Sequence, residues 1–75
     1  MHIIKEKMRV TMDYYDCDGK ILRIGDTVQF FNGHYYKCIN TLYGIGLKCL
    51  SIKLPVILIE RISVDHILCS AKKHK

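Results

Sequence analysis

Residues 16 to 28 read Asp-Cys-Asp-Gly-Lys-Ile-Leu-Arg-Ile-Gly-Asp-Thr-Val, and residues 29 to 39 continue Gln-Phe-Phe-Asn-Gly-His-Tyr-Tyr-Lys-Cys-Ile. The first part places Asp18-Gly19 and Gly25-Asp26 on either side of a short apolar segment. Both pairs are typical of tight turns, because Asp tolerates the left-handed backbone region and Gly has no Cβ to clash there. The second part contains two β-rich runs joined by Asn32-Gly33, a dipeptide that suits a two-residue hairpin turn. This stretch therefore predicts an all-β fold.

A two-residue turn at Asn32-Gly33 would fix the pairing of the two hairpin strands. It sets Phe31 opposite His34 and Phe30 opposite Tyr35. Side chains alternate between the two faces of a strand, so one face would carry Val28, Phe30, Tyr35 and Ile39, and the other Gln29, Phe31, His34, Tyr36 and Cys38. We expect the first face to be the core side. A slip of one residue would exchange the two faces.

Alternation with a period of two residues continues along most of the chain and predicts further short strands. These lie at 8–15, 21–24, 47–54 and 56–63, and residues 64–69 would form a last short strand or a helical turn. Several short strands separated by turn signals are typical of small barrels and rolled sheets. We therefore expect a small barrel, or a rolled antiparallel sheet, of about five to six short strands.

The charge is concentrated towards the C-terminus. Seventy-five residues make one small domain, which we expect to occupy residues 1–70. The formal net charge is +5, from 12 Lys and Arg against 7 Asp and Glu. Lys72, Lys73 and Lys75 carry three of these positive charges, which leaves +2 (5 minus 3) on the rest. Residues 71–75 are therefore predicted to form a basic C-terminal tail.

The cysteines and the apolar segments bear on the compartment. The sequence has four cysteines, and its N-terminal residues are charged too early for a secretory signal peptide. The longest uncharged apolar stretch, Leu54 to Ile59, is too short to span a bilayer. We expect a cytoplasmic protein with no membrane partner, whose cysteines are reduced thiols that pack as small hydrophobic side chains.

The Asp16-x-Asp18-Gly19 motif is compatible with the start of a calcium loop, but the rest of that loop is missing. In the calcium-loop frame the first ligand position is Tyr14 and the twelfth is Gly25, where a carboxylate is required. We therefore interpret the motif as a turn.

Other reactive side chains form no recognisable site. His34 and Cys38 have the spacing of close zinc ligands, but on a strand they would be roughly 13 Å apart. The serines lie in no nucleophile motif, and no glycine-rich phosphate loop precedes a helix. The sequence predicts no metal, no cofactor and no catalytic residue, and hence a protein that is not an enzyme.

The aromatic residues are the more informative signal, since all seven fall within residues 14 to 43. Alternation prevents all of them from pointing inwards. An exposed aromatic side chain beside a cation can stack on a nucleic-acid base or anchor a protein partner. The candidate partner-binding residues are exposed aromatic or polar residues of the hairpin and nearby cations: Phe31, His34, Tyr36, Lys37, Arg23, Lys20 and Lys48.

The stretch from Asp18-Gly19-Lys20 to Gly25-Asp26-x-Val28, followed by Asn32-Gly33, resembles the opening of SH3-like barrels. It is similar to the Gly-Asp-x-Val segment of KOW-type modules, which bind RNA or ribosomal and transcription proteins. It also resembles the start of small phage-encoded YopX-like proteins. The resemblance covers about a third of the chain, residues 16 to 38, and implies a barrel scaffold without catalytic residues.

Two functions follow as hypotheses. The first is a module that docks on a protein or nucleoprotein partner through Phe31, Tyr36 and an open strand edge, as a phage-type inhibitor or accessory factor would. The alternative is direct RNA or DNA binding by Lys20, Arg23, Lys37, Lys48 and the basic tail around the exposed aromatics. A nearly neutral body with a basic tail favours the first. Assembly of a homodimer through residues 56–59 is a further alternative.

Overall fold

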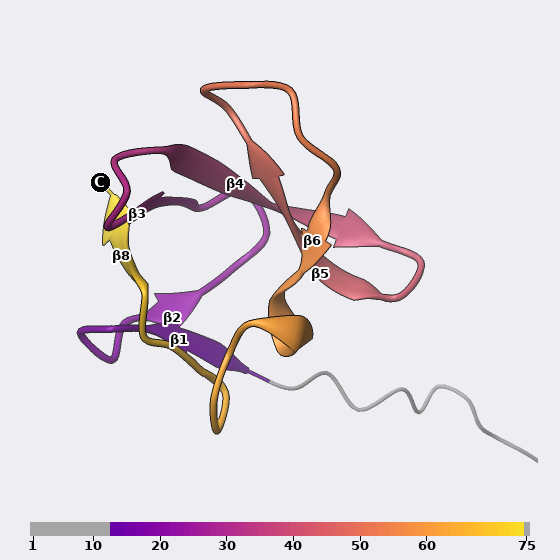
Figure 1. Cartoon of the computed structure of the whole chain (residues 1–75). Helices are drawn as coiled ribbons and strands as arrows, with labels where there is room; N and C mark the ends of the chain where they lie inside the picture. Colours follow the sequence, from indigo (N-terminus) through magenta and orange to yellow (C-terminus); the bar gives the residue numbers. More distant parts are fainter. Residues whose placement is uncertain (1–12, 75) are drawn as a thin grey trace, which may run out of the picture.

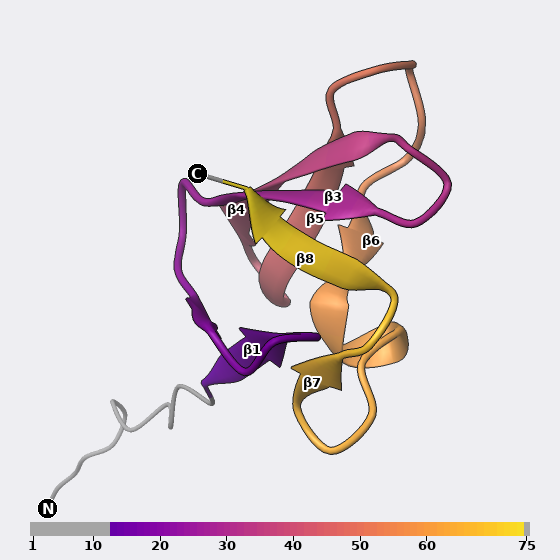
Figure 2. The same ribbon diagram turned by 90° about the vertical axis from the view of Figure 1, so that its left-hand side faces the viewer.

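The structure is a computed structural model that describes residues 13–74. Its elements are β1 (Tyr14–Asp16), β2 (Ile21–Leu22), β3 (Thr27–Phe30), β4 (Tyr35–Thr41), β5 (Gly44–Cys49), β6 (Ile57–Leu58), the 3-10 helix η2 (Ile59–Arg61), β7 (Ile67–Leu68) and β8 (Ala71–His74). The strands form a five-stranded sheet of order β6-β5-β4-β3-β8 and a three-stranded sheet of order β2-β1-β7 (Figures 1 and 2). The prediction of an all-β fold is confirmed, but the strands within residues 13–74 do not close into a barrel.

Antiparallel hairpins build the centre of the five-stranded sheet, with β3 paired to β4 and β4 to β5. The hairpin predicted at Asn32-Gly33 is present, but its turn has three residues, Phe31 to Gly33. The N–H of Phe30 donates to the carbonyl of His34 at 2.9 Å, and the N–H of Gly33 donates to the carbonyl of Phe30 at 2.8 Å. Gly33 has φ +92°, the left-handed conformation that ends a three-residue turn.

The longer turn makes the predicted register of this hairpin wrong by one residue. Val28 lies opposite Tyr36, in place of Lys37. The slip exchanges the two faces of β4, so Tyr36 and Cys38 point into the core, while Tyr35 lies on the outer face with Lys37.

The core is assembled from both sheets and η2. Its buried hydrophobic residues are Tyr14, Leu22, Val28, Tyr36, Cys38, Leu47, Cys49, Ile59, Leu68 and Ala71. Cys38 and Cys49 are free thiols among these apolar side chains. Burial, and to a smaller extent the charge of Asp26, raise the pKa of Cys38 to about 11. This thiol therefore stays protonated and unreactive near neutral pH.

The three-stranded sheet is small and irregular. β1 pairs with β2 in antiparallel orientation and with β7 in parallel orientation, over two residue pairs in each case. The predicted segment at 64–69 forms β7, a strand, after a two-residue turn at Asp65-His66. Of the strand predicted at residues 8–15, only Asp13 to Tyr15 lie within the described part, and Tyr14 and Tyr15 belong to β1.

The buried carboxylate of Asp16 links the two sheets by a hydrogen bond between β1 and β8. Asp16 is fully buried, and its Oδ2 accepts a hydrogen bond from the N–H of Lys73 in β8 at 2.6 Å. Its Oδ1 accepts from the N–H groups of Asp18 and Lys20 at 2.9 and 2.8 Å. Burial acts to raise the pKa of this carboxyl, but the three backbone donors outweigh burial and the pKa is lowered from its usual 3.8. The motif interpreted as a turn is thus a turn that also ties β1 to β8.

The basic tail predicted at residues 71–75 is not a tail over residues 71–74. These residues form β8, which pairs with β3 along its full length. Ala71 is fully buried, and the Nζ of Lys73 lies 3.1 Å from both the carbonyl oxygen of Ile21 and Oδ2 of Asp26. The ladder with β3, the contacts of the Lys73 side chain and the Asp16 carboxylate therefore fix a segment that has almost no apolar side chains. Lys75 lies outside the described residues.

The strands predicted at 47–54 and 56–63 are shorter than expected. β5 ends at Cys49, and the N–H of Leu50 makes one further hydrogen bond to the carbonyl of Tyr35, the first residue of β4. Residues 50–56 then form a loop that projects from the sheet (Figures 1 and 2). Its aliphatic side chains are exposed: Leu50, Ile52, Leu54 and Val56. The chain returns as the two-residue strand β6 and the single turn η2. No helix within residues 13–74 has the length and apolar character to cross a membrane.

Candidate functional site

The charges of the described residues are divided unequally between the five-stranded sheet and the rest. The five strands of this sheet contain four lysines and no acidic residue. The remaining described residues contain four basic and six acidic side chains. The sheet therefore has a formal charge of +4, and the rest of residues 13–74 has a formal charge of −2.

A row of polar side chains crosses the outer face of the five-stranded sheet. Thr27 in β3 is paired with His74 in β8 on one side and with Lys37 in β4 on the other. Lys37 is in turn paired with Lys48 in β5. Paired residues share one face of a sheet, and neighbouring strands lie about 4.8 Å apart. Two exposed lysines and a histidine therefore lie along one line across four strands.

A second row brings an aromatic side chain and a third lysine to the same face. Gln29 in β3 is paired with Lys72 in β8 and with Tyr35 in β4. The rings of Tyr35 and His74 are in contact, with centroids 5.1 Å apart and planes at 73°. We call the set Tyr35, Lys37, Lys48, Lys72 and His74 the cationic face. Lys73 is not part of it, because its side chain points to the inner side and pairs with Asp26.

The lysines at the centre of the cationic face stand directly opposite each other. The ion pairs within residues 13–74 join Lys72 to Asp18 at 3.5 Å and Lys73 to Asp26 at 3.1 Å, and neither includes Lys37 or Lys48. Like charges at directly opposed positions of neighbouring strands destabilise a sheet. An anion bound between the two ammonium groups would remove this repulsion.

The predicted partner-binding residues are spread over different parts of the molecule. Lys37 and Lys48 lie together on the cationic face, and Phe31 is 76% exposed at the β3–β4 turn. Lys20 and Arg23 are exposed and lie immediately before and after β2 of the three-stranded sheet. His34 is half-buried after the turn.

Tyr36 was wrongly expected to be an exposed partner-binding residue. It is 6% exposed, and its ring packs on Phe30 with centroids 4.6 Å apart. The cause is the three-residue turn, which directs Tyr36 inwards and Tyr35 outwards. Phe31 and Tyr36 therefore do not form one exposed docking surface.

Sequence reasoning missed Tyr35 as a member of the cationic face, and it placed Lys72 and His74 in a basic tail and not in a strand. The face on which Tyr35 lies depends on the length of the hairpin turn. Because Tyr35 and Tyr36 are the same residue type, the sequence does not show which of the two points into the core. Lys72 and His74 alternate with Ala71 and Lys73, which is a weak strand signal in a segment of four residues.

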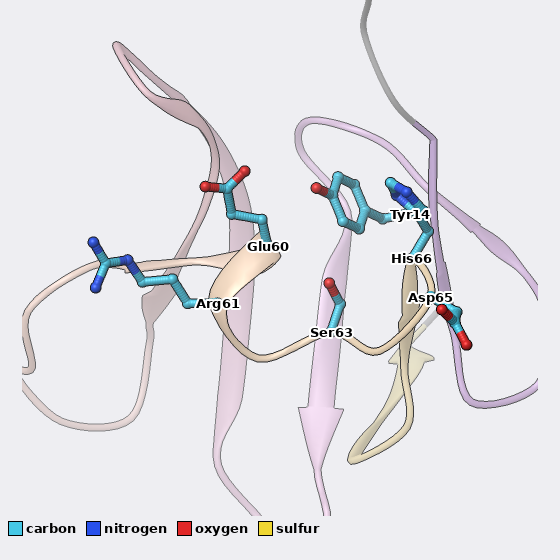
Figure 3. Close-up of a pocket in the computed structure, with 6 residues that line it drawn as sticks. All are labelled: Tyr14, Glu60, Arg61, Ser63, Asp65 and His66. Atoms are coloured by element: carbon cyan, nitrogen blue, oxygen red, sulfur yellow. The ribbon is translucent and has the colours of Figure 1, made fainter.

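A separate pocket of about 450 Å³ lies next to η2 and is lined by Tyr14, Glu60, Arg61, Ser63, Asp65 and His66 (Figure 3). The rings of Tyr14 and His66 are 5.0 Å apart, and the buried Nδ1 of His66 has no hydrogen-bond partner among the described residues. Arg61 and Asp65 are directed away from these two rings (Figure 3). The side chains therefore do not converge on one point, as a catalytic group and its orienting partners must.

Residues 13–74 contain no cluster of three or more His, Cys, Asp or Glu side chains that could hold a metal ion.

No protein-family model, no curated protein and no solved structure matches this chain.

Proposed function

We propose that the protein binds nucleic acid through the cationic face. The observation that supports this function best is the pairing of Lys37 with Lys48 in one row with His74, on a sheet whose strands contain no acidic residue. A phosphate backbone presents negative charges at a regular short spacing and attracts such an array, with release of its bound counterions. The similarity of residues 16–38 to KOW-type modules points to the same class of partner.

The strand at the C-terminal end changes the balance between the two functional hypotheses. The argument for protein docking was that the positive charge belonged to a tail and left the body almost neutral. β8 instead holds Lys72 and His74 beside β3, on the same face as Lys37 and Lys48. The charge is thus concentrated on a folded surface, which favours nucleic acid.

Binding by this surface has a characteristic dependence on salt. Three exposed lysines on the face can neutralise about three phosphates of a single strand, which gives a slope of log K against log salt concentration near −2. Fluorescence anisotropy of labelled single- and double-stranded RNA and DNA, in rising salt, measures this slope. The double variant Lys37→Gln/Lys48→Gln should bind more weakly and reduce the slope by about 1.4.

The matched control for that experiment is Lys53→Gln/Arg61→Gln, which removes the same charge from a loop and from η2. It should leave affinity and slope nearly unchanged. Failure of every nucleic acid to bind in about 50 mM salt would contradict the proposal. So would an equal loss of affinity in the control, because binding would then follow net charge and not the cationic face.

Docking on a protein is the second candidate function, and the projecting loop at 50–56 supports it. Leu50 and Ile52 are 52% and 49% exposed, and Leu42 and Tyr43 in the β4–β5 turn, at the other end of β5, are 93% and 77% exposed. Exposed apolar side chains of this kind are typical of interaction surfaces. A partner captured from cell extract after nuclease treatment, and lost on Ile52→Ser/Leu54→Ser, would support this function. A partner retained by that variant would contradict it.

A further inference from the structure

Tyr35 is the tyrosine of the cationic face and lies at the start of β4. Lys37 follows it on the same strand and the same side, and Lys72 lies two strands away in the same row, beyond Gln29. His74 contacts its ring in an edge-to-face geometry, at 5.1 Å and 73°. The one aromatic side chain of the face is therefore flanked by lysines on two sides.

The contact between these two rings leaves aromatic surface free for a further ring. In an edge-to-face pair, one ring contributes an edge and the other contributes a single face. The remaining ring faces are not used by this contact. Tyr35 is partly exposed and His74 is exposed. A planar group that approaches the cationic face can therefore stack on one of these rings.

Single strands and duplexes would meet this surface differently. The cationic face extends across four strands of a sheet, whereas the major groove admits an α-helix or a two-stranded ribbon, so its side chains reach phosphates but not the base edges. The bases of a duplex are stacked on one another inside the helix. The bases of a single strand can swing out and stack on aromatic side chains while the phosphates follow the cations.

We infer that the cationic face takes single-stranded nucleic acid, with a base stacked on Tyr35 and phosphates at Lys37, Lys48 and Lys72. This inference rests on the proposed function and narrows it to one class of ligand. Stacking on an aromatic side chain does not depend on hydrogen bonds to base edges, so binding should depend little on sequence.

The test compares a labelled single-stranded DNA of about 12 nucleotides, the RNA of the same sequence and the corresponding DNA duplex. The proteins are the wild type, Tyr35→Leu, Tyr35→Phe and Lys37→Gln/Lys48→Gln. At equal salt, the wild type should bind either single strand about tenfold more tightly than the duplex. Tyr35→Leu should weaken single-strand binding about tenfold, and duplex binding much less, whereas Tyr35→Phe, which keeps the ring, should bind like the wild type.

The outcomes separate this inference from the proposed function. Equal affinity for single strand and duplex, or unchanged single-strand binding by Tyr35→Leu, would overturn the inference. If the lysine variant still lost affinity, the proposed function would stand. If neither variant lost affinity, both would fail. Should Tyr35→Leu not fold, as judged by circular dichroism, His74→Leu replaces it, and a selective loss of single-strand binding is again the expected result.

Discussion

The two sheets are held together by different kinds of interaction. The five-stranded sheet has regular ladders, of which β4 with β5 is the longest, with six residue pairs. The three-stranded sheet has only two residue pairs at each of its interfaces, and it depends on three backbone N–H groups that converge on the carboxylate of Asp16. Backbone pairing leaves the side chains of the first sheet free to form a charged surface. In the second sheet, a side chain itself is part of the framework.

This difference separates stability from binding. A change at Asp16 should affect folding, because the group is buried and bonded to both sheets. A change at Lys37 or Lys48 should affect binding, because both side chains are exposed and repel each other. Four sets of variants or conditions test this separation, from the largest expected effect to the smallest.

Asp16→Ala should lower the free energy of unfolding by about 3 kcal/mol or more, because it leaves three backbone N–H groups without their acceptor in a buried site. Urea unfolding followed by circular dichroism measures the loss. Asp18→Ala is the control, since the Asp18 pair with Lys72 is largely exposed and should contribute less than about 1 kcal/mol. Similar losses in the two variants would mean that the Asp16 carboxylate does not join the sheets.

Gly46→Ala should destabilise the outer end of the five-stranded sheet by about 1 to 2 kcal/mol. A Cβ at this position would lie 2.6 Å from Cγ1 of Val56 and 2.8 Å from Cγ2 of Thr41. The loop at 50–56 would have to move away from β5. Thermal unfolding of Gly46→Ala and of Gly46→Ala/Val56→Ala measures this, and the second variant should regain much of the loss. Equal stability of Gly46→Ala and the wild type would show that Val56 does not pack on β5.

The pH dependence of stability should carry the signature of Asp16. Its pKa is lowered from 3.8 in the folded protein, so the unfolded chain binds the proton more readily. The contribution of Asp16 is therefore fully present above the unfolded pKa and is lost as the pH falls through the folded pKa. Urea unfolding of the wild type and Asp16→Asn from pH 6 down to about pH 2 should show a gap between the two that narrows towards low pH. A gap that stays constant would contradict the lowered pKa.

Lys37→Glu should raise the free energy of unfolding slightly, by about 0.5 kcal/mol, because it places opposite charges at directly opposed positions of β4 and β5. The same variant should lose nucleic-acid binding. Urea unfolding and anisotropy on one preparation test both effects. If Lys37→Glu were less stable than the wild type and bound nucleic acid normally, Lys37 would contribute to folding and not to binding.

The sequence predicted the elements that depend on neighbouring residues. The turn at Asp18-Gly19 and the hairpin at Asn32-Gly33 form where Gly can take a positive φ, and both glycines do so. The length of the hairpin turn was not predictable, because Phe30, Phe31, Tyr35 and Tyr36 place an aromatic side chain on both faces under either register. One residue of turn length decided which tyrosine is exposed.

The features that depend on distant residues could not be read from the sequence. Residues 71–74 are stabilised by pairing with β3 and by the Asp16 carboxylate, 57 positions before Lys73 in the chain. The residues Ala-Lys-Lys-His do not themselves indicate that this segment forms a strand. Of the cationic face, Lys37 and Lys48 are among the candidate residues named from the sequence, and the structure places them opposite each other and exposed. Their common face, and the addition of Lys72, His74 and Tyr35, required the register of the strands.

A titration of the ¹⁵N-labelled protein with a short single-stranded oligonucleotide, followed by the backbone amide signals, tests the central claim most directly. The largest shifts should fall on Tyr35, Lys37, Lys48 and Lys72, on three strands that meet only in the folded sheet. Signals of residues 52–56 and of the turn at Asp65-His66 should change little. Shifts confined to residues 52–56, or to Lys20 and Arg23 beside β2, would contradict the assignment of the cationic face as the binding surface.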